Sequence, residues 1–270
     1  MTLKSQTGFF PSLLSSRQYS GTISTLFYNW PIFAGVLFFG LVTLSVSVML
    51  TAPWTWLFLA SGIGVLALAA SILLTTFFVY DWGQQHEYDR LAKLGDVANA
   101  NVVIDITCGK LRGSRGLLRH HQQGYYFLLD IFDPEKMADP ALHRARQMEP
   151  ALLTQQRIYR REAKVTNLPL PHHWADVIYC DFRLHEIENA ADQTALFAEF
   201  GRVLKPGGRL LIAEHSRDWL NLLAFGPGVF SFFPAATWTR HIEQAGLVIR
   251  HHERWRGLVH LWVAERTRSS

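Results

Sequence analysis

Residues 175–215, ADVIYCDFRLHEIENAADQTALFAEFGRVLKPGGRLLIAEH, decide the fold of this chain. The stretch opens with ADVIYC, a short apolar run that is typical of a buried strand. QTALFAEFGRVL then places apolar residues at helical spacing, and the turn KPGG is expected to end that helix. RLLIAEH has the character of a further strand. Two strands joined through a helix in this way are the unit of a parallel sheet.

The segments on either side continue this alternation of strands and helices. NVVIDI at residues 101–106 and YYFLLDI at residues 125–131 are apolar runs. A Gly-containing turn and a helical segment separate them, which predicts a β–α–β unit. A basic segment at residues 140–161 is expected to be helical. A further helix is expected at residues 234–245, and LVIRHHERW and LVHLWVAER alternate as an antiparallel pair does.

These elements predict an α/β domain at residues 101–270, a Rossmann-like doubly wound sheet of seven strands that ends in an antiparallel hairpin. The formal net charge of +4, from 26 basic and 22 acidic residues, is small, so we expect no nucleic acid partner. Cys108 and Cys180 are too few for a disulfide framework, and we expect both to be free thiols.

The N-terminal part has no charged residue between Arg17 and Asp81. Two apolar runs, at residues 30–52 and 54–80, are each longer than the roughly 20 residues that span a bilayer. Pro53 lies between them and disfavours helix at the preceding residue, so we expect the chain to reverse there. The alternative is a buried hairpin in a soluble protein, which would need more covering surface than the rest of the chain supplies. A cleaved signal peptide is not expected, because about 30 mostly polar and aromatic residues precede the first apolar run.

The expected organisation is an interfacial segment (1–29), a two-helix transmembrane hairpin (30–80), a linker helix (81–100) and the α/β domain (101–270). Basic residues flank the hairpin and its tip has none, which predicts that both ends of the hairpin are cytoplasmic. We therefore expect a multi-pass protein of the inner (cytoplasmic) membrane, with its α/β domain on the cytoplasmic side and the lipid bilayer as a partner.

The ordered series ADVIYC, RLHEI and LKPGG, placed after a β–α–β unit, resembles the class I S-adenosylmethionine-dependent methyltransferases of the group that includes ubiquinone and menaquinone methyltransferases. The resemblance runs from about Val102 to the C-terminus. It implies S-adenosylmethionine as cofactor and methyl transfer to a small molecule. Because a membrane anchor suits an acceptor that is also in the bilayer, we expect a hydrophobic or amphiphilic acceptor, with the oligomeric state left open.

The resemblance also implies which residues contact the cofactor. The family has an acidic residue and glycines at the end of the first strand, and Asp105, Thr107, Gly109 and Leu111 occupy those positions here. Of the glycine positions, only Gly109 is still a glycine. Asp105 has the alternative role of accepting hydrogen bonds from its own turn. The lost glycines motivate a competing hypothesis, a non-catalytic methyltransferase-like module that scaffolds a membrane complex.

Acidic residues after the next three strands complete the implied site. Asp130 matches the ribose-binding acid of the family, with Asp133 as the near alternative, because a carboxylate at the end of a strand can accept both ribose hydroxyls. Glu162 and Ala163 are the best match to an acid-and-small-residue pair after the third strand. Asp181, beyond the fourth strand, lies where the acceptor and the methyl group are expected to meet.

His185, in RLHEI, is the candidate catalytic base, since a pKa near 6.5 suits removal of a proton from a hydroxyl or a carbon acid. The alternative is a histidine that packs or caps a helix. Histidine pairs at residues 120–121, 172–173 and 251–252 resemble ligand sources, yet sequence neighbours point apart on strands and helices. No metal site is therefore expected.

Overall fold

The structure is a computed structural model and describes residues 20–82, 84–148 and 158–267. Its contacts divide the chain into two compact units. The first unit contains the N-terminal helices together with Leu223–Gly226, and the second contains the remaining residues from Gln84 onwards.

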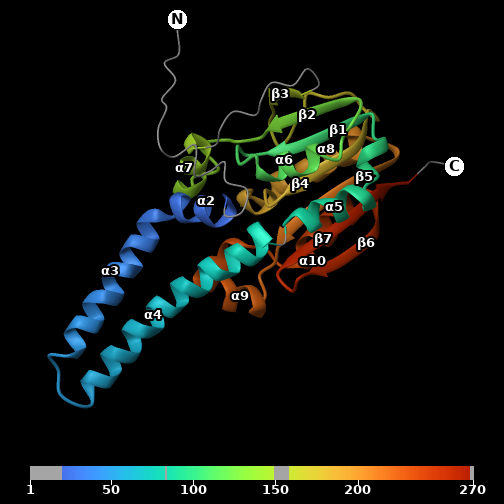
Figure 1. Cartoon of the computed structure of the whole chain (residues 1–270). Coiled ribbons are helices and arrows are strands. Elements are labelled where there is room, and N and C mark those ends of the chain that lie inside the picture. The colour runs from blue at the N-terminus through green and yellow to red at the C-terminus, as the bar shows by residue number, and fades with distance from the viewer. Residues whose placement is uncertain (1–19, 83, 149–157, 268–270) are drawn as a thin grey trace, which may run out of the picture. The chain divides into compact units, whose positions relative to one another are not determined.

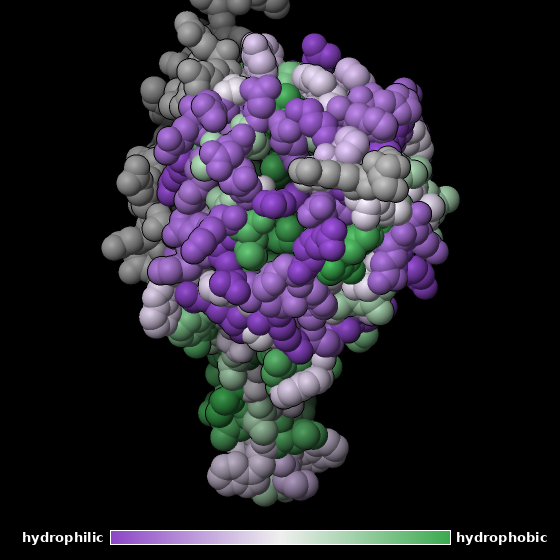
Figure 2. All heavy atoms as spheres, turned by 90° about the vertical axis from the view of Figure 1, so that its right-hand side faces the viewer, coloured by the Kyte–Doolittle hydropathy of each residue, from purple (hydrophilic) through white to green (hydrophobic). Residues whose placement is uncertain are grey.

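The first unit is built around two long apolar helices (Figure 1). Its elements are α2 (Ser20–Tyr28), α3 (Trp30–Ser47), α4 (Trp54–Thr76) and a π-helical continuation, η1 (Phe77–Trp82). By length and composition, α3 and the continuous helix Trp54–Trp82 are each sufficient to cross a membrane. The surface of these helices is mainly hydrophobic in Figure 2, whereas that of the second unit is mainly hydrophilic.

Glycines let α3 and α4 pack closely. A Cβ at Gly40 would lie 2.7 Å from a methyl carbon of Leu66, and one at Gly62 would lie 2.8 Å from a methyl carbon of Leu44. Gly64, in contrast, has nothing within 4 Å of such a Cβ. Small residues at two positions therefore bring the helices together, as is common for helices in lipid.

Asp81 fixes the start of α2. Its carboxylate accepts hydrogen bonds from the backbone amides of Gly21 (2.6 Å) and Thr22 (2.9 Å) and from the Thr22 hydroxyl (2.6 Å). Amides at the N-terminus of a helix have no partner within the helix, so this carboxylate satisfies them and complements the helix dipole. The end of the hairpin is thus tied to the helix that precedes it.

The second unit contains a seven-stranded sheet in the order β3-β2-β1-β4-β5-β7-β6 (Figure 1). The strands are β1 (Val102–Thr107), β2 (Tyr125–Asp130), β3 (Ile158–Glu162), β4 (Ala175–Asp181), β5 (Leu204–His215), β6 (Leu247–Trp255) and β7 (Val259–Arg266). The first five strands pair in parallel, while β7 pairs antiparallel with both β5 and β6. The doubly wound sheet with a final antiparallel hairpin is confirmed.

Helices and 3-10 turns connect the strands, and several of the helices cover the sheet. The helices are α5 (Gln84–Leu94), α6 (Arg112–Leu118), α7 (Pro140–Met148), α8 (Ala190–Val203), α9 (Trp219–Phe225) and α10 (Ala235–Gln244), with 3-10 turns η2 (Val97–Asn99), η3 (Leu184–Glu186) and η4 (Gly226–Ser231). α5 packs against α6, and α8 packs against α10. β1 is buried along its whole length, as expected for a strand covered on both faces. The core includes Trp238 of α10 and Trp262 of β7, both fully buried.

Two boundaries differ from the sequence-based expectation. Residues 158–161 belong to β3 rather than to a helix, because Tyr159 stacks on Phe127 with ring centroids 5.1 Å apart and the backbone pairs with β2. The KPGG segment is part of β5, which starts at Leu204 directly after α8. Residues 149–157 of the expected helix and residues 1–19 of the expected interfacial segment lie outside the described residues.

Candidate functional site

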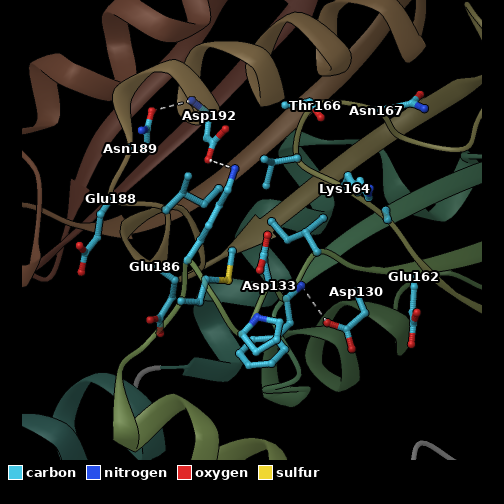
Figure 3. Close-up of a pocket in the computed structure, with 18 of the residues that line it drawn as sticks. Asp130, Asp133, Glu162, Lys164, Thr166, Asn167, Glu186, Glu188, Asn189 and Asp192 are labelled. Carbon is cyan, nitrogen blue, oxygen red and sulfur yellow. Dashed lines mark hydrogen bonds and ion pairs between the residues drawn. The ribbon is translucent and has the colours of Figure 1, made fainter.

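A pocket with a volume of about 1200 Å³ opens where β2 and β3 end (Figure 3). Asp130 ends β2, Glu162 ends β3, and both line the pocket. Ile131, Phe132 and Ile187 add apolar surface to its wall. Open α/β sheets bind ligands at the carboxyl ends of their parallel strands, and this volume suffices for a nucleoside-sized group.

Asp130 is the charged centre of this pocket. Its carboxylate accepts two hydrogen bonds from Arg146 of α7, at 2.8 and 3.0 Å, and one from Arg160 of β3, at 2.8 Å. Burial alone would raise the pKa of Asp130, but the hydrogen bonds from Arg146 and Arg160 outweigh it, so the pKa is lowered. Asp130 is therefore ionised at neutral pH, with both oxygens engaged by guanidinium groups.

Three further candidate residues line the same pocket as Asp130, namely Glu162, Ala163 and Asp133. Ala163 follows Glu162 at the end of β3, lines the pocket, and donates its amide to the carbonyl of Asp130 at 2.9 Å. Asp133 also lines the pocket, but its carboxylate accepts from the amide of Glu135 at 3.0 Å and so caps its own turn. The structure thus brings the expected acid-and-small-residue pair to the same pocket as Asp130.

A threonine holds the turn after β1 where the resemblance implies a glycine. Thr107 Oγ1 accepts from the amide of Gly109 at 2.9 Å and donates to the carbonyl of Lys110 at 3.1 Å. Gly109 has a φ of +105°, and a Cβ there would lie 2.5 Å from Nη1 of Arg146. Leu111 is buried and directly precedes α6. The turn is therefore closed by a side-chain hydrogen bond, and Arg146 covers its glycine.

Asp105 lies inside β1 and does not line the pocket. It is 1% exposed and accepts a hydrogen bond from the Tyr126 hydroxyl at 2.7 Å. Burial raises the pKa of Asp105 to about 7, while hydrogen bonds from Ser114 and Tyr126 act in the opposite direction. Its contacts are thus with side chains of α6 and β2, and they support the turn rather than face a ligand.

Asp181, at the end of β4, meets a second buried acid, Glu87 of α5. Both side chains are nearly inaccessible, and Asp181 Oδ1 and Glu87 Oε1 have no hydrogen-bond partner among the described residues. Burial raises the pKa of both carboxyl groups, and the charge of Asp181 raises that of Glu87 further. The positive charge of Arg112 acts on both acids, and that of Arg183 on Asp181, in the opposite direction. Phe182, the next residue, has a φ of +51°, a strained value for a non-glycine residue. Unpartnered buried oxygens beside a strained backbone are features of functional sites.

Sequence reasoning missed Glu87. In the linker helix, Tyr88, Leu91 and Ala92 are buried and mark the inward face of α5. Glu87 precedes Leu91 by one helical turn and therefore lies on that same face. An acid on the apolar face of an amphipathic helix is the signal that would have identified it.

His185 is paired with Glu214 of β5. Nδ1 of His185 donates to Oε1 of Glu214 at 2.7 Å, and the other carboxylate oxygen accepts from the amide of Leu184 at 2.9 Å. Burial alone would lower the pKa of His185, but the charge and hydrogen bond of Glu214, with a contribution from Glu186, raise it above 6.5. Because an ionised carboxylate only accepts, Nδ1 carries a proton and Nε2 is the atom that can take up another.

The histidine pairs and cysteines show no metal arrangement. Among the described residues, no group of three His, Cys, Asp or Glu side chains is placed to hold a metal ion. His120 instead lies 3.0 Å from Asp89, and His251 lies 3.3 Å from Glu253. Cys108 and Cys180 are both free and buried.

Comparisons with known sequences point to one family. Residues 104–212 match a family model described as a methyltransferase domain. Over 71 residues the chain is 38% identical to the ubiquinone/menaquinone biosynthesis C-methyltransferase of Francisella tularensis subsp. novicida. The aligned stretch is 26% of this chain and 27% of that protein. The protein of the same name from Vibrio campbellii also matches at 38% identity over 71 residues, 26% of either chain. These matches span about a quarter of each relative.

Solved structures share the fold at low sequence identity. A SAM dependent methyltransferase from Aquifex aeolicus superposes with a TM-score of 0.53 at 16% identity, covering 68% of this chain and 92% of that chain. The [4+2]-cyclase SpnF superposes with a TM-score of 0.52 at 14% identity, covering 68% and 81%. At these identities the comparison establishes the fold alone.

Proposed function

Since the chain contains a methyltransferase domain with the class I S-adenosylmethionine-dependent fold, we propose that it transfers a methyl group from S-adenosylmethionine to a hydrophobic or amphiphilic small molecule in a membrane. The observation that carries the proposal is the His185–Glu214 pair, in which His185 lies directly before the pocket residues Glu186 and Ile187 in the chain. A base held next to a nucleotide-sized pocket suits transfer to an acceptor that must lose a proton.

The pocket residues fit the adenosine half of S-adenosylmethionine. Asp130 is an ionised acceptor at the end of β2, suited to ribose hydroxyls, and Ile131, Phe132 and Ile187 offer apolar surface for adenine. When bound, S-adenosylmethionine supplies a methyl group already activated on a sulfonium. Arg146 has to release Asp130 for this contact, because it bonds both carboxylate oxygens.

The buried acids Asp181 and Glu87 suit the cationic half of the cofactor. Each has an oxygen without a partner among the described residues, and burial keeps both away from water. A positive charge brought next to them lowers their pKa values and is itself stabilised in return. Neither acid lines the pocket, and Arg112 and Arg183 already supply positive charge to them. We therefore assign them to holding positive charge next to the pocket rather than to proton transfer.

His185 acts as the base. With Nδ1 held by Glu214, Nε2 removes the proton from a hydroxyl or an acidic carbon of the acceptor. The carboxylate of Glu214 stabilises the imidazolium that results. Such a base contributes about 10²–10⁴-fold to a rate, and the positioning of acceptor and methyl group contributes the remainder.

We also propose that α3 and α4 anchor the enzyme in the inner membrane, with the sheet domain in the cytoplasm. Their length and composition support a membrane span, and Arg90 and Lys93 follow η1 whereas the tip at residues 51–54 is uncharged. A Thr51→Cys variant should react with an impermeant maleimide on the outer face of the membrane in spheroplasts, since the native cysteines are buried. Reaction only after lysis would contradict this topology.

Calorimetric titration of the detergent-solubilised chain with S-adenosylmethionine and S-adenosylhomocysteine tests the activity. We expect both to bind. Failure of both would favour the non-catalytic module, an alternative supported by the engagement of Asp130 with Arg146 and Arg160. The matched variant His185→Gln should bind the cofactor with unchanged affinity and transfer radiolabelled methyl into total membrane lipid about 10²–10⁴-fold more slowly.

A further inference from the structure

A loop leaves the sheet domain after Arg217 and returns to it at the same place. The amide of Arg217 donates to the carbonyl of Phe233 at 3.0 Å. The guanidinium of Arg217 donates to the carbonyls of Phe232, at 2.7 Å, and Phe230, at 2.9 Å. These bonds close the base of a loop made of α9 and η4, which we call the α9–η4 loop (residues 218–232). The base of the loop is therefore fixed by hydrogen bonds.

The α9–η4 loop exposes large apolar side chains. Trp219, Leu223 and Phe230 are 66%, 64% and 68% exposed, and Leu222 is 44% exposed. The other exposed large hydrophobic side chains in the described part of the chain after residue 83, none above 49%, are Tyr125, Tyr159 and Val248. Apolar surface gathered in one short loop marks an interaction site rather than the usual scatter of single residues.

The composition of the loop favours lipid over a protein partner. No charged residue lies between Asp218 and Arg240. Protein interfaces surround an apolar centre with a polar rim, whereas membrane-entering segments combine Trp, Phe and Leu with basic flanks. Arg217 directly precedes Asp218 at one end of the uncharged segment, and Arg240 of α10 bounds its other end. Leu223–Gly226 also belong to the same compact unit as the apolar helices α3 and α4.

Only the loop, and not the helix after it, is free to enter lipid. Trp219–Ser231 and Ala235–Gln244 together have the length and composition of a membrane span, but the pair is bent by 57°. α10 is packed in the core of the sheet domain through Trp238 and Ile242. A span is therefore excluded for the pair, and a shallow insertion of the α9–η4 loop remains.

The base of the loop contacts the candidate catalytic base. The ring of Phe232 lies 5.5 Å from the ring of His185 and 5.0 Å from that of His215, centroid to centroid. Phe230, the most exposed aromatic residue of the loop, is two residues away. The exposed part of the loop thus lies two residues from a side chain that contacts His185.

We propose that the α9–η4 loop inserts into the hydrocarbon region of the bilayer and guides a lipid-soluble acceptor from there to His185. The insertion of the loop does not depend on the proposed function, whereas the guidance of the acceptor rests on the proposed methyl transfer. Leu223 and Phe230 enter the lipid, and Trp219 lies at the level of the headgroups. Removal of these side chains from water stabilises the insertion in proportion to their apolar area.

Fluorescence quenching by lipid tests the insertion. The full chain is reconstituted in vesicles with a bimane label on Phe230→Cys, on Phe39→Cys of α3 as a positive control, or on Gln244→Cys as a negative control. Gln244 is exposed and is the last residue of α10. The native cysteines are buried, so the label is specific. Lipids that carry a spin label on the acyl chain should quench positions 230 and 39 several-fold more than position 244.

Each other outcome overturns the insertion. Equal quenching at positions 230 and 244, with strong quenching at position 39, would mean that the loop is in water. Protection of position 230 from iodide without quenching by lipid would mean that a protein, such as a second copy of the chain, covers the loop. Neither readout involves cofactor or activity, so a failure of the proposed methyl transfer remains distinguishable.

A charge variant tests the guidance of the acceptor. Phe230→Glu should reduce methyl transfer into vesicles of total membrane lipid several-fold, with the affinity for S-adenosylmethionine unchanged, because a carboxylate is costly in the hydrocarbon region. Val248→Glu, on the surface of β6, adds the same charge elsewhere and should leave transfer unchanged. Equal transfer by the two variants would refute the guidance, and a lower cofactor affinity of Phe230→Glu would show that the loop acts on the cofactor instead.

Discussion

Replacing Glu214 by glutamine should lower the pKa of His185 by about one unit. A hydrogen bond to a charged group contributes about 1.5–3 kcal/mol and one between neutral groups about 0.5–1.5 kcal/mol, so loss of the charge removes about 1–1.5 kcal/mol. At 1.36 kcal/mol per unit, this corresponds to about one pKa unit. Glu214 is fully buried and the His185 side chain is 15% exposed, so water screens the pair little.

The pH dependence of kcat/KM measures this change. The neutral imidazole is the active form, so the acidic limb of the profile should move down by about one unit in Glu214→Gln. An NMR titration of the His185 ring should give the same shift. His185→Gln is the control and should lack this limb. A limb that stays in place in Glu214→Gln, or one that persists in His185→Gln, would refute the role of His185 as the base.

The same pair links stability to pH. Because the pKa of His185 is raised in the folded chain, its contribution to the free energy of unfolding is complete well below pH 6.5 and is lost as the pH rises through the raised value. Glu214→Gln should therefore lower the thermal stability more at pH 5.5 than at pH 9.

Three other predictions concern residues outside this pair. Asp130→Ala should weaken S-adenosylmethionine binding by about tenfold or more in calorimetry, since hydrogen bonds to a carboxylate contribute about 1.5–3 kcal/mol, while Arg146→Gln should strengthen binding by freeing that carboxylate. Unchanged affinity in both variants would remove the ribose contact. Burial raises the pKa of Asp105 to about 7, so the free energy of unfolding should fall as the pH rises from about 4 to 7. Asp105→Asn should flatten this slope in chemical denaturation. An unaltered slope would mean that another group causes the pH dependence. Gly62→Ala should lower the melting temperature in detergent and Gly64→Ala should not, because only Gly62 lies against the other helix; equal melting temperatures would contradict that packing.

The sheet was predictable from the sequence wherever its strands are buried. β1, β2 and β4 are covered on both faces and therefore appear as continuous apolar runs. β3 was missed because it is an edge strand with mostly exposed side chains, and its sequence, IYRRE, has no apolar pattern. An apolar run in the sequence indicates a buried strand, and an edge strand with exposed side chains has no such run.

The candidate site was predictable only in part, for a related reason. Asp130 and Asp181 stand at strand ends, a position that the sequence pattern itself defines. Arg146, Glu87 and Glu214 were not predicted, because each meets its partner through tertiary packing. Glu214 lies 29 residues from His185 along the chain and reaches it only because β5 pairs with β4.

The position of β7 determines when the sheet domain can fold. β7 follows β6 in the chain and is the last strand of the described residues, yet it lies between β5 and β6 and pairs with both. Its final residue, Arg266, also donates to the carbonyl of Leu204, at the junction of α8 and β5. On the ribosome, the apolar helices α3 and α4 emerge long before residue 266 does. The sheet can close only after residue 266 has left the ribosome, while chaperones can already act on α3 and α4.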